Sequence, residues 1–139
     1  MDQTVVAAVT CAEPCGDCGA ERECHGVQAL VDGRLRWDTE LDCAACGSRL
    51  TVCGGALPPE RRAQLLAEHG ATALRVTGPA ASRVAVMRVL RAELGLDLAF
   101  ARAMARQVLE GECSGTRPEM ERLARALRVS GVAATATGP

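Results

Sequence analysis

The chain has 139 residues, enough for one domain or two small ones, and its net charge of −1 excludes a uniformly basic surface of the kind that coats nucleic acid. With one Phe, one Trp and no Tyr, any core must be built from Ala, Val and Leu. All 16 basic residues are arginine, a bias typical of GC-rich bacterial genomes.

The charge is divided along the chain. Residues 1–56 hold 4 Arg and 9 acidic residues, a net of −5, whereas residues 57–139 hold 12 Arg and 8 acidic residues, a net of +4. No apolar run reaches the length of a membrane span, and residues 1–10 lack the basic start of a signal peptide. We therefore expect a cytoplasmic protein without a membrane partner.

Residues 4–10 read as a short strand that leads into the first of two similar motifs. Residues 15–19 are Cys-Gly-Asp-Cys-Gly and residues 43–47 are Cys-Ala-Ala-Cys-Gly. Two residues between cysteines let both sulfurs face one point, and the following glycine permits a tight turn that aims backbone amides at the thiolates. The pattern predicts one tetrahedral structural Zn²⁺ bound by Cys15, Cys18, Cys43 and Cys46. Two disulfides are the alternative, which the missing secretory signal disfavours.

The segment between the motifs predicts a β-hairpin. Strands are expected at 27–31 and 34–38, because Asp32-Gly33 is typical of a two-residue type I′ turn. A third strand is expected at 49–53, which completes a small β-rich zinc ribbon over residues 1–56. Trp37 is expected to cover the ribbon's small core, with stacking on a ligand as the alternative.

Four cysteines remain outside the two motifs. Cys11, Cys24, His25 and Cys53 could form a second metal site, and Cys11 could replace a ligand of the first. Burial as small hydrophobic residues is the favoured interpretation for these cysteines and for Cys113.

Residues 57–72 read as a linker with a helix at 60–69. Pro58-Pro59 opens the helix and Gly70 ends it. His69 lies near the helix C-terminus, where its charge would favour the helix dipole, and no residue pattern indicates a partner for general-base catalysis.

From residue 73 the pattern predicts a β-α-α-β-α-β domain. Strands are expected at 73–77, 112–114 and 132–137. Helices are expected from a Ser82 cap to about 94, from an Asp97 cap over 98–109, and from a Thr116–Glu119 capping box to about 128. The whole chain is therefore predicted to be α+β: a zinc ribbon, then, in residues 73–139, an antiparallel sheet with three helices on one face.

One segment of this domain carries a family pattern. Residues 83–91 read Arg-Val-Ala-Val-Met-Arg-Val-Leu-Arg, followed by Gly-Leu-Asp-Leu at 95–98 and Ala-Arg at 101–102. Residues 73–137 resemble the C-terminal domain of the bacterial ribosomal stalk protein, large-subunit protein seven/twelve. That family reads Lys-Val-Ala-Val-Ile-Lys-x-Val-Arg, then Gly-Leu-x-Leu and Lys-Glu-Ala-Lys, and residues 116–131 fit its capped third helix and final turn.

The resemblance implies a surface for protein partners, because the family's helical hairpin is where translational GTPases dock. Carried over position by position, the docking residues are Arg83, Val84, Met87, Arg88, Arg91, Leu98 and Arg102. Ala99 and Phe100 depart from the family's Lys-Glu pair. A lone Phe in so aliphatic a domain favours a core position, although an outward Phe100 would enlarge the apolar centre of the docking surface. The family's dimerisation region and hinge are replaced here by the zinc ribbon.

The sequence thus favours a non-enzymatic zinc-binding adaptor whose arginine-bearing hairpin docks on an acidic protein surface, such as a translation factor or the ribosome. The alternatives are a nucleic-acid-associated zinc-ribbon regulator and a substrate adaptor for a protease. The acidic ribbon argues against nucleic acid. No Ser-His-Asp set, phosphate loop or convincing carboxylate pair indicates an enzyme.

Overall fold

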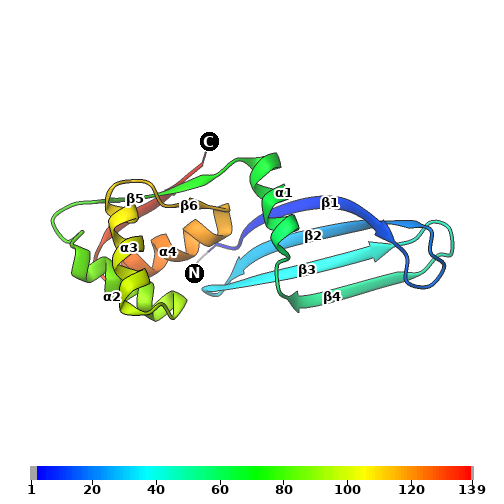
Figure 1. Cartoon of the computed structure of the whole chain (residues 1–139), viewed down its shortest axis with the longest axis horizontal. Helices are drawn as coiled ribbons and strands as arrows, with labels where there is room; N and C mark the ends of the chain where they lie inside the picture. Colours follow the sequence, from blue (N-terminus) through cyan, green and yellow to red (C-terminus); the bar gives the residue numbers. More distant parts are fainter. Residues whose placement is uncertain (1–2, 139) are drawn as a thin grey trace. The chain divides into compact units, whose positions relative to one another are not determined.

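The computed structural model describes residues 3–138 and has the α+β architecture that the sequence predicts. The chain divides into two compact units, Met1–His69 and Gly70–Pro139, each with its own antiparallel sheet. A four-stranded sheet and one helix form the first unit, and three helices with a three-stranded sheet form the second (Figure 1).

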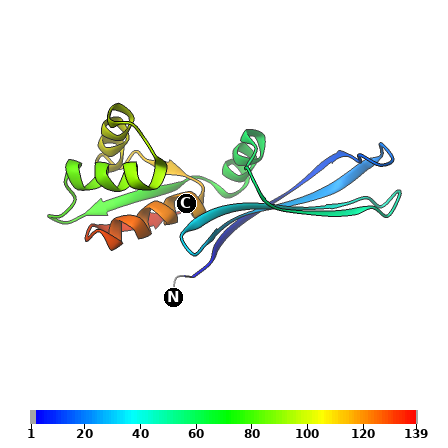
Figure 2. The ribbon, with the colours of Figure 1, turned by 90° about the horizontal axis from the view of Figure 1, so that it is seen from below.

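The first sheet is an antiparallel meander of β1 (Val5–Pro14), β2 (Glu21–Val31), β3 (Arg34–Asp42) and β4 (Arg49–Gly55), in that order. Asp32 and Gly33 have φ values of 50° and 77°, as a type I′ turn requires, which confirms the predicted hairpin. In a meander, alternate connections fall at the same end of the sheet. The β1–β2 and β3–β4 loops, which carry the two cysteine motifs, therefore emerge together at one end, as Figure 2 shows.

A small apolar core lies on one face of this sheet. Trp37 is only 6% exposed and packs with Val9 of β1 and Leu65 of α1 (Pro59–His69). The indole ring lies directly over Gly26, because a Cβ built on Gly26 would come within 2.2 Å of it. Trp37 is thus a core residue, as predicted.

Helix α1 belongs to the first unit, whereas the sequence placed it in a linker. The apolar side chain that fixes it is Leu65, which is 1% exposed. Two polar side chains also bind the outer edge of β1: Gln64 Nε2 donates to the Thr10 carbonyl and His69 Nε2 to the Ala8 carbonyl, both at 2.7 Å. The sequence could not assign this role to His69, because its partner lies 61 residues away.

The second sheet has the order β6-β5-β7 and is antiparallel throughout, built from β5 (Thr72–Thr77), β6 (Ser114–Gly115) and β7 (Ala133–Thr137). Burial alternates along β5 and β7, so one face of the sheet is covered and the other is exposed. The covering helices are α2 (Arg83–Leu94), α3 (Leu98–Leu109) and α4 (Arg117–Val129). β6 lies later than the predicted strand at 112–114, because its two residues pair with Thr72 and Ala73 at the start of β5.

The core of the second unit is aliphatic. Its members come from β5, β7 and one side of each helix, and include Leu74, Val86, Leu90, Val108, Leu123 and Leu127. The predicted caps are all present. Ser82 Oγ accepts from the Ala85 N–H at 3.1 Å, and Asp97 Oδ1 accepts from the Phe100 N–H at 2.8 Å. The Thr116–Glu119 capping box is closed in both directions.

Candidate functional site

The two cysteine motifs fold into nearly identical loops. In the first, the Cys15 N–H donates to the Ala20 carbonyl at 2.7 Å and the Gly19 N–H to the Cys15 carbonyl at 2.9 Å. In the second, the corresponding bonds join Cys43 to residues 48 and 47, at 2.9 and 2.8 Å. The closing glycines have φ values of 76° and 75°, a left-handed conformation that other residues adopt only with strain. The repeated motif therefore produces a repeated turn.

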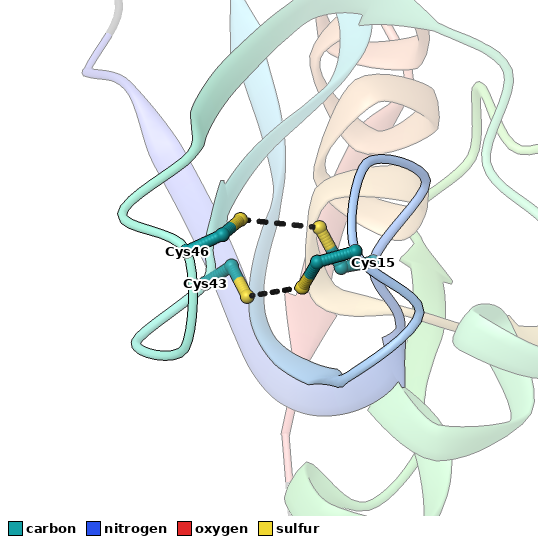
Figure 3. Close-up of side chains that lie close together, drawn as sticks. Cys15, Cys43 and Cys46 are labelled. Carbon is teal, nitrogen blue, oxygen red and sulfur yellow. Dashed lines mark hydrogen bonds between the residues drawn. The ribbon is translucent and has the colours of Figure 1, made fainter.

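These loops bring four sulfur atoms together. All four lie within 4.8 Å of one another, and the two loops face each other so that Cys15 Sγ is 3.8 Å from Cys46 Sγ and Cys18 Sγ is 3.6 Å from Cys43 Sγ (Figure 3). Among the described residues, no two cysteines are joined in a disulfide. The arrangement is a four-sulfur cluster that could hold one metal ion, as the sequence predicts.

Backbone dipoles favour thiolate at two of the four positions. The pKa of Cys15 falls to about 6, because the N–H groups of Cys18 and Asp17 point at its sulfur, the second at 3.4 Å. The pKa of Cys43 is lowered in the same way, chiefly by the N–H of Cys46. Cys15 and Cys43 are buried, and Cys18 and Cys46 are exposed. Each loop thus supplies one buried sulfur that is stabilised as thiolate by its own backbone.

Arg22 is a neighbour of the cluster that the sequence analysis missed. Its pKa is raised, first by a hydrogen bond to Glu13 and further by the Cys15 sulfur, and its Nη2 lies 2.8 Å from Glu13 Oε1. A guanidinium group here offsets part of the negative charge that four thiolates gather. The only signal in the sequence is that Arg22 follows the first loop closely.

The remaining cysteines do not assemble a second metal site. Within residues 3–138, the four loop cysteines are the only group of three or more metal-binding side chains gathered around one point. Cys24 and His25 are neighbours on a strand, so their side chains point to opposite faces of the sheet. Cys53 is exposed on β4, so the expectation that it is buried is wrong, whereas Cys113 is buried in the core of the second unit as expected.

A second candidate site is a shallow apolar hollow of about 750 Å³ on the α2–α3 hairpin. Five of the seven residues predicted as a partner surface line it: Val84, Met87, Arg88, Arg91 and Leu98. The lining also includes Ala92, Gly95 and Leu96, which the sequence analysis did not name. Ala92 lies one turn beyond Arg88 on the same side of α2, and helical spacing could have identified it.

Large apolar side chains are exposed on this hairpin. Val84 and Leu98 are 65% and 61% exposed, and Met87 is half-buried. Phe100 is 68% exposed, so the expectation that it joins the core is wrong. The reason is helical phase: Ala101, Ala105 and Val108 form the buried side of α3, and Phe100 lies off that side in the first turn.

Three of the four arginines of α4 form ion pairs, whereas the arginines of the hairpin form none among the described residues. Arg122 binds Glu93, and Arg125 and Arg128 bind Glu121, at N–O distances of 3.0 to 3.3 Å. By contrast, the exposed hairpin arginines have no ion-pair partner within residues 3–138; they are Arg83, Arg88, Arg91, Arg102 and Arg106. Arg88 and Arg91 line the hollow, Arg83 begins α2, and Arg102 lies one turn beyond Leu98.

Within the described residues, no helix is long and apolar enough to cross a membrane. Comparisons with models of protein families, with curated proteins and with solved structures found no match to this chain.

Proposed function

We propose that the chain is a non-enzymatic adaptor in which a structural zinc ion holds the first unit together and the α2–α3 hairpin docks on an acidic protein surface. The observation that carries the docking proposal is the hollow itself, an apolar depression lined in part by two arginines that have no carboxylate partner among residues 3–138. Exposed arginines steer and select a partner, and an apolar centre supplies the affinity that they lack.

The geometry of the four-sulfur cluster supports zinc as the metal. A tetrahedral zinc with Zn–S bonds of about 2.3 Å separates its sulfurs by about 3.8 Å, close to the 3.6 and 3.8 Å between the facing pairs. Four thiolates fill all the positions of such an ion and leave none for water or substrate, so the role proposed for this metal is structural.

The partner that we propose is a translational GTPase, and it comes from the resemblance of residues 73–137 to the ribosomal stalk domain. Charge supports an acidic protein, because Arg83, Arg88, Arg91 and Arg102 leave a local excess of positive charge. The exposed Val84, Leu98 and Phe100 favour a protein over nucleic acid, since phosphate recognition gains little from aliphatic side chains.

The test is a binding titration of the full chain against a purified translational GTPase at low and high salt. R88E/R91E should weaken binding about tenfold or more, since reversed charges at the hollow cost at least the 1.4 kcal/mol that a factor of ten represents. Added salt should weaken wild-type binding as well. R117E is the matched control, because Arg117 is an exposed arginine of the same unit that does not line the hollow.

Two results would contradict the proposal in separable ways. Equal binding by R88E/R91E and wild type would remove the hollow as the docking site. A lack of binding to any translational GTPase would remove the partner. Circular dichroism of each variant establishes that its helices are intact.

A further inference from the structure

We propose that Cys11 and Cys24 form a redox-active thiol pair that closes to a disulfide when a hydroperoxide reaches it. The two residues lie directly opposite each other on neighbouring antiparallel strands β1 and β2. Opposed residues share one face of a sheet, so both side chains project to the same side. Both cysteines lie outside the four-sulfur cluster and outside the hollow on the α2–α3 hairpin.

The backbone pattern fixes the type of this cross-strand pair. The carbonyls of Ala8 and Thr10 point outward, where His69 and Gln64 donate to them. Because the two kinds of pair alternate along an antiparallel ladder, Cys11 and Cys24 form a hydrogen-bonded pair with Cα atoms about 5.5 Å apart. That separation lies at the preferred value for disulfides, about 5.5–6 Å.

A disulfide at this position would be reversible. Opposed Cβ atoms lie about 4.5–5.5 Å apart in a sheet, whereas a disulfide needs about 3.5–4.5 Å. Although the Cα separation suits a disulfide, the two Cβ atoms must tilt toward each other by roughly 1 Å, which strains the bond and makes it easier to reduce. Such bonds belong to the labile class rather than the structural one.

The two thiols have different surroundings that suit different roles. Cys11 is half-buried and lines a hollow of about 530 Å³ beside the second cysteine loop, so a small oxidant can reach it. Cys24 is only 4% exposed. Burial first, and then a hydrogen bond with the Cys11 side chain, raises the pKa of Cys24 to about 12. Cys11 is therefore the thiol that is oxidised first, and Cys24 is the resolving thiol already in contact with it.

The reaction has two balanced steps. The Cys11 sulfur attacks a hydroperoxide oxygen, the O–O bond breaks, and an alcohol leaves (water, for hydrogen peroxide), which gives a sulfenic acid. The Cys24 sulfur then attacks the Cys11 sulfur; the S–S bond forms, the S–O bond breaks, and the hydroxide leaves as water with the Cys24 proton. Two thiols and one hydroperoxide thus yield one disulfide, one alcohol and one water.

No other cysteine offers an equivalent pair among the described residues. The four loop cysteines belong to the four-sulfur cluster. Cys53 is exposed on β4, where its neighbour Val52 lies opposite Thr39, and Cys113 is buried in the core of the second unit. Cys53 is therefore the matched control for an accessible thiol without a cross-strand partner.

The experiment treats the full chain with a slight excess of hydrogen peroxide, alkylates the remaining thiols, digests with trypsin and maps the peptides. Cleavage after Arg22 and Arg34 places Cys11 in peptide 1–22 and Cys24 in peptide 23–34. We expect these two peptides to become linked, with fragmentation placing the bond at Cys11, and dithiothreitol to separate them again. C53S should leave the link unchanged, and C11A should abolish it.

Two outcomes would overturn the proposal. One is that Cys11 and Cys24 are still fully alkylated after the loop cysteines have been oxidised. The other is that C11A still gives the linked peptides, because the bond would then come from Cys15 or Cys18. The first result is measured on the wild-type protein and the second on C11A. Neither depends on zinc being the bound metal.

Discussion

At the scale of single residues, the close contact between Gly26 and Trp37 determines whether Trp37 can pack into the core of the first unit. The indole ring occupies the space where any side chain at position 26 would begin. Gly26 is thus required for close approach rather than for backbone freedom, since its φ does not lie in the left-handed region.

We predict that G26A destabilises the first unit by about 1–3 kcal/mol, the usual cost of overpacking a core. The new methyl group must displace the ring, because 2.2 Å is far inside contact distance. Urea unfolding followed by the emission of Trp37, the single tryptophan, measures the change. G55A is the control, since its added Cβ would meet only the Trp37 carbonyl at 3.9 Å. A G26A midpoint equal to that of G55A would contradict the packing described here.

Single residues were predictable where local chemistry decides their place. The four loop cysteines and the helix caps follow from spacing alone, because a turn or a cap is set within five residues. Phe100 and His69 were not predictable in this way. The first depends on which side of α3 meets the core, and the second on a carbonyl that lies 61 residues earlier in the chain.

At the scale of elements, α4 shows how much a helix start contributes. Thr116 Oγ1 accepts from the Glu119 N–H at 3.4 Å, and Glu119 Oε1 accepts from the Thr116 N–H at 3.0 Å. Pro118 follows within the first turn, where its missing N–H costs nothing. The capping box therefore fixes the residue at which α4 begins.

We predict that T116A lowers the stability of the second unit by about 1 kcal/mol, the typical loss for an N-cap. Thermal unfolding followed by far-ultraviolet circular dichroism measures it. T116S retains the hydroxyl and should recover most of the loss. If T116A and T116S unfold at the temperature of wild type, the side-chain cap does not contribute to stability.

Helices were easier to predict than strands for a physical reason. Their caps and breakers are local, so the predicted 98–109 helix agrees with the observed one. β2 was expected at 27–31 but begins at Glu21, although residues 21–26 have little intrinsic preference for a strand. They are extended because β1 and β3 pair with them on both sides, and that information is not local.

At the scale of the whole molecule, the two units should respond differently to loss of metal. The first unit has a very small core, centred on Val9, Trp37 and Leu65, whereas thirteen buried residues form the core of the second. A unit that buries so little apolar surface needs a cross-link such as a bound metal ion for its stability.

We predict one zinc ion per chain by elemental analysis and selective unfolding of the first unit by a strong chelator. Trp37 emission should shift to the red, while amide exchange in α2, α3 and α4 stays slow. C18S should lose the metal, and C53S, which alters an exposed cysteine outside the cluster, should retain it. Protein purified without chelator and free of metal would contradict the zinc proposal, and unchanged Trp37 emission after chelation would contradict its structural role.

The position of α1 has a consequence for self-association. Two of its side chains bind the outward carbonyls of Ala8 and Thr10, so this part of the β1 edge is not open to a further strand. Among the described residues β4 pairs only with β3, and all seven of its residues are exposed. A filament needs an open edge at both ends of every subunit, whereas α1 covers part of one edge of this sheet. Helix α1 therefore hinders growth of this sheet into a fibre beyond a pair of molecules that meet along β4.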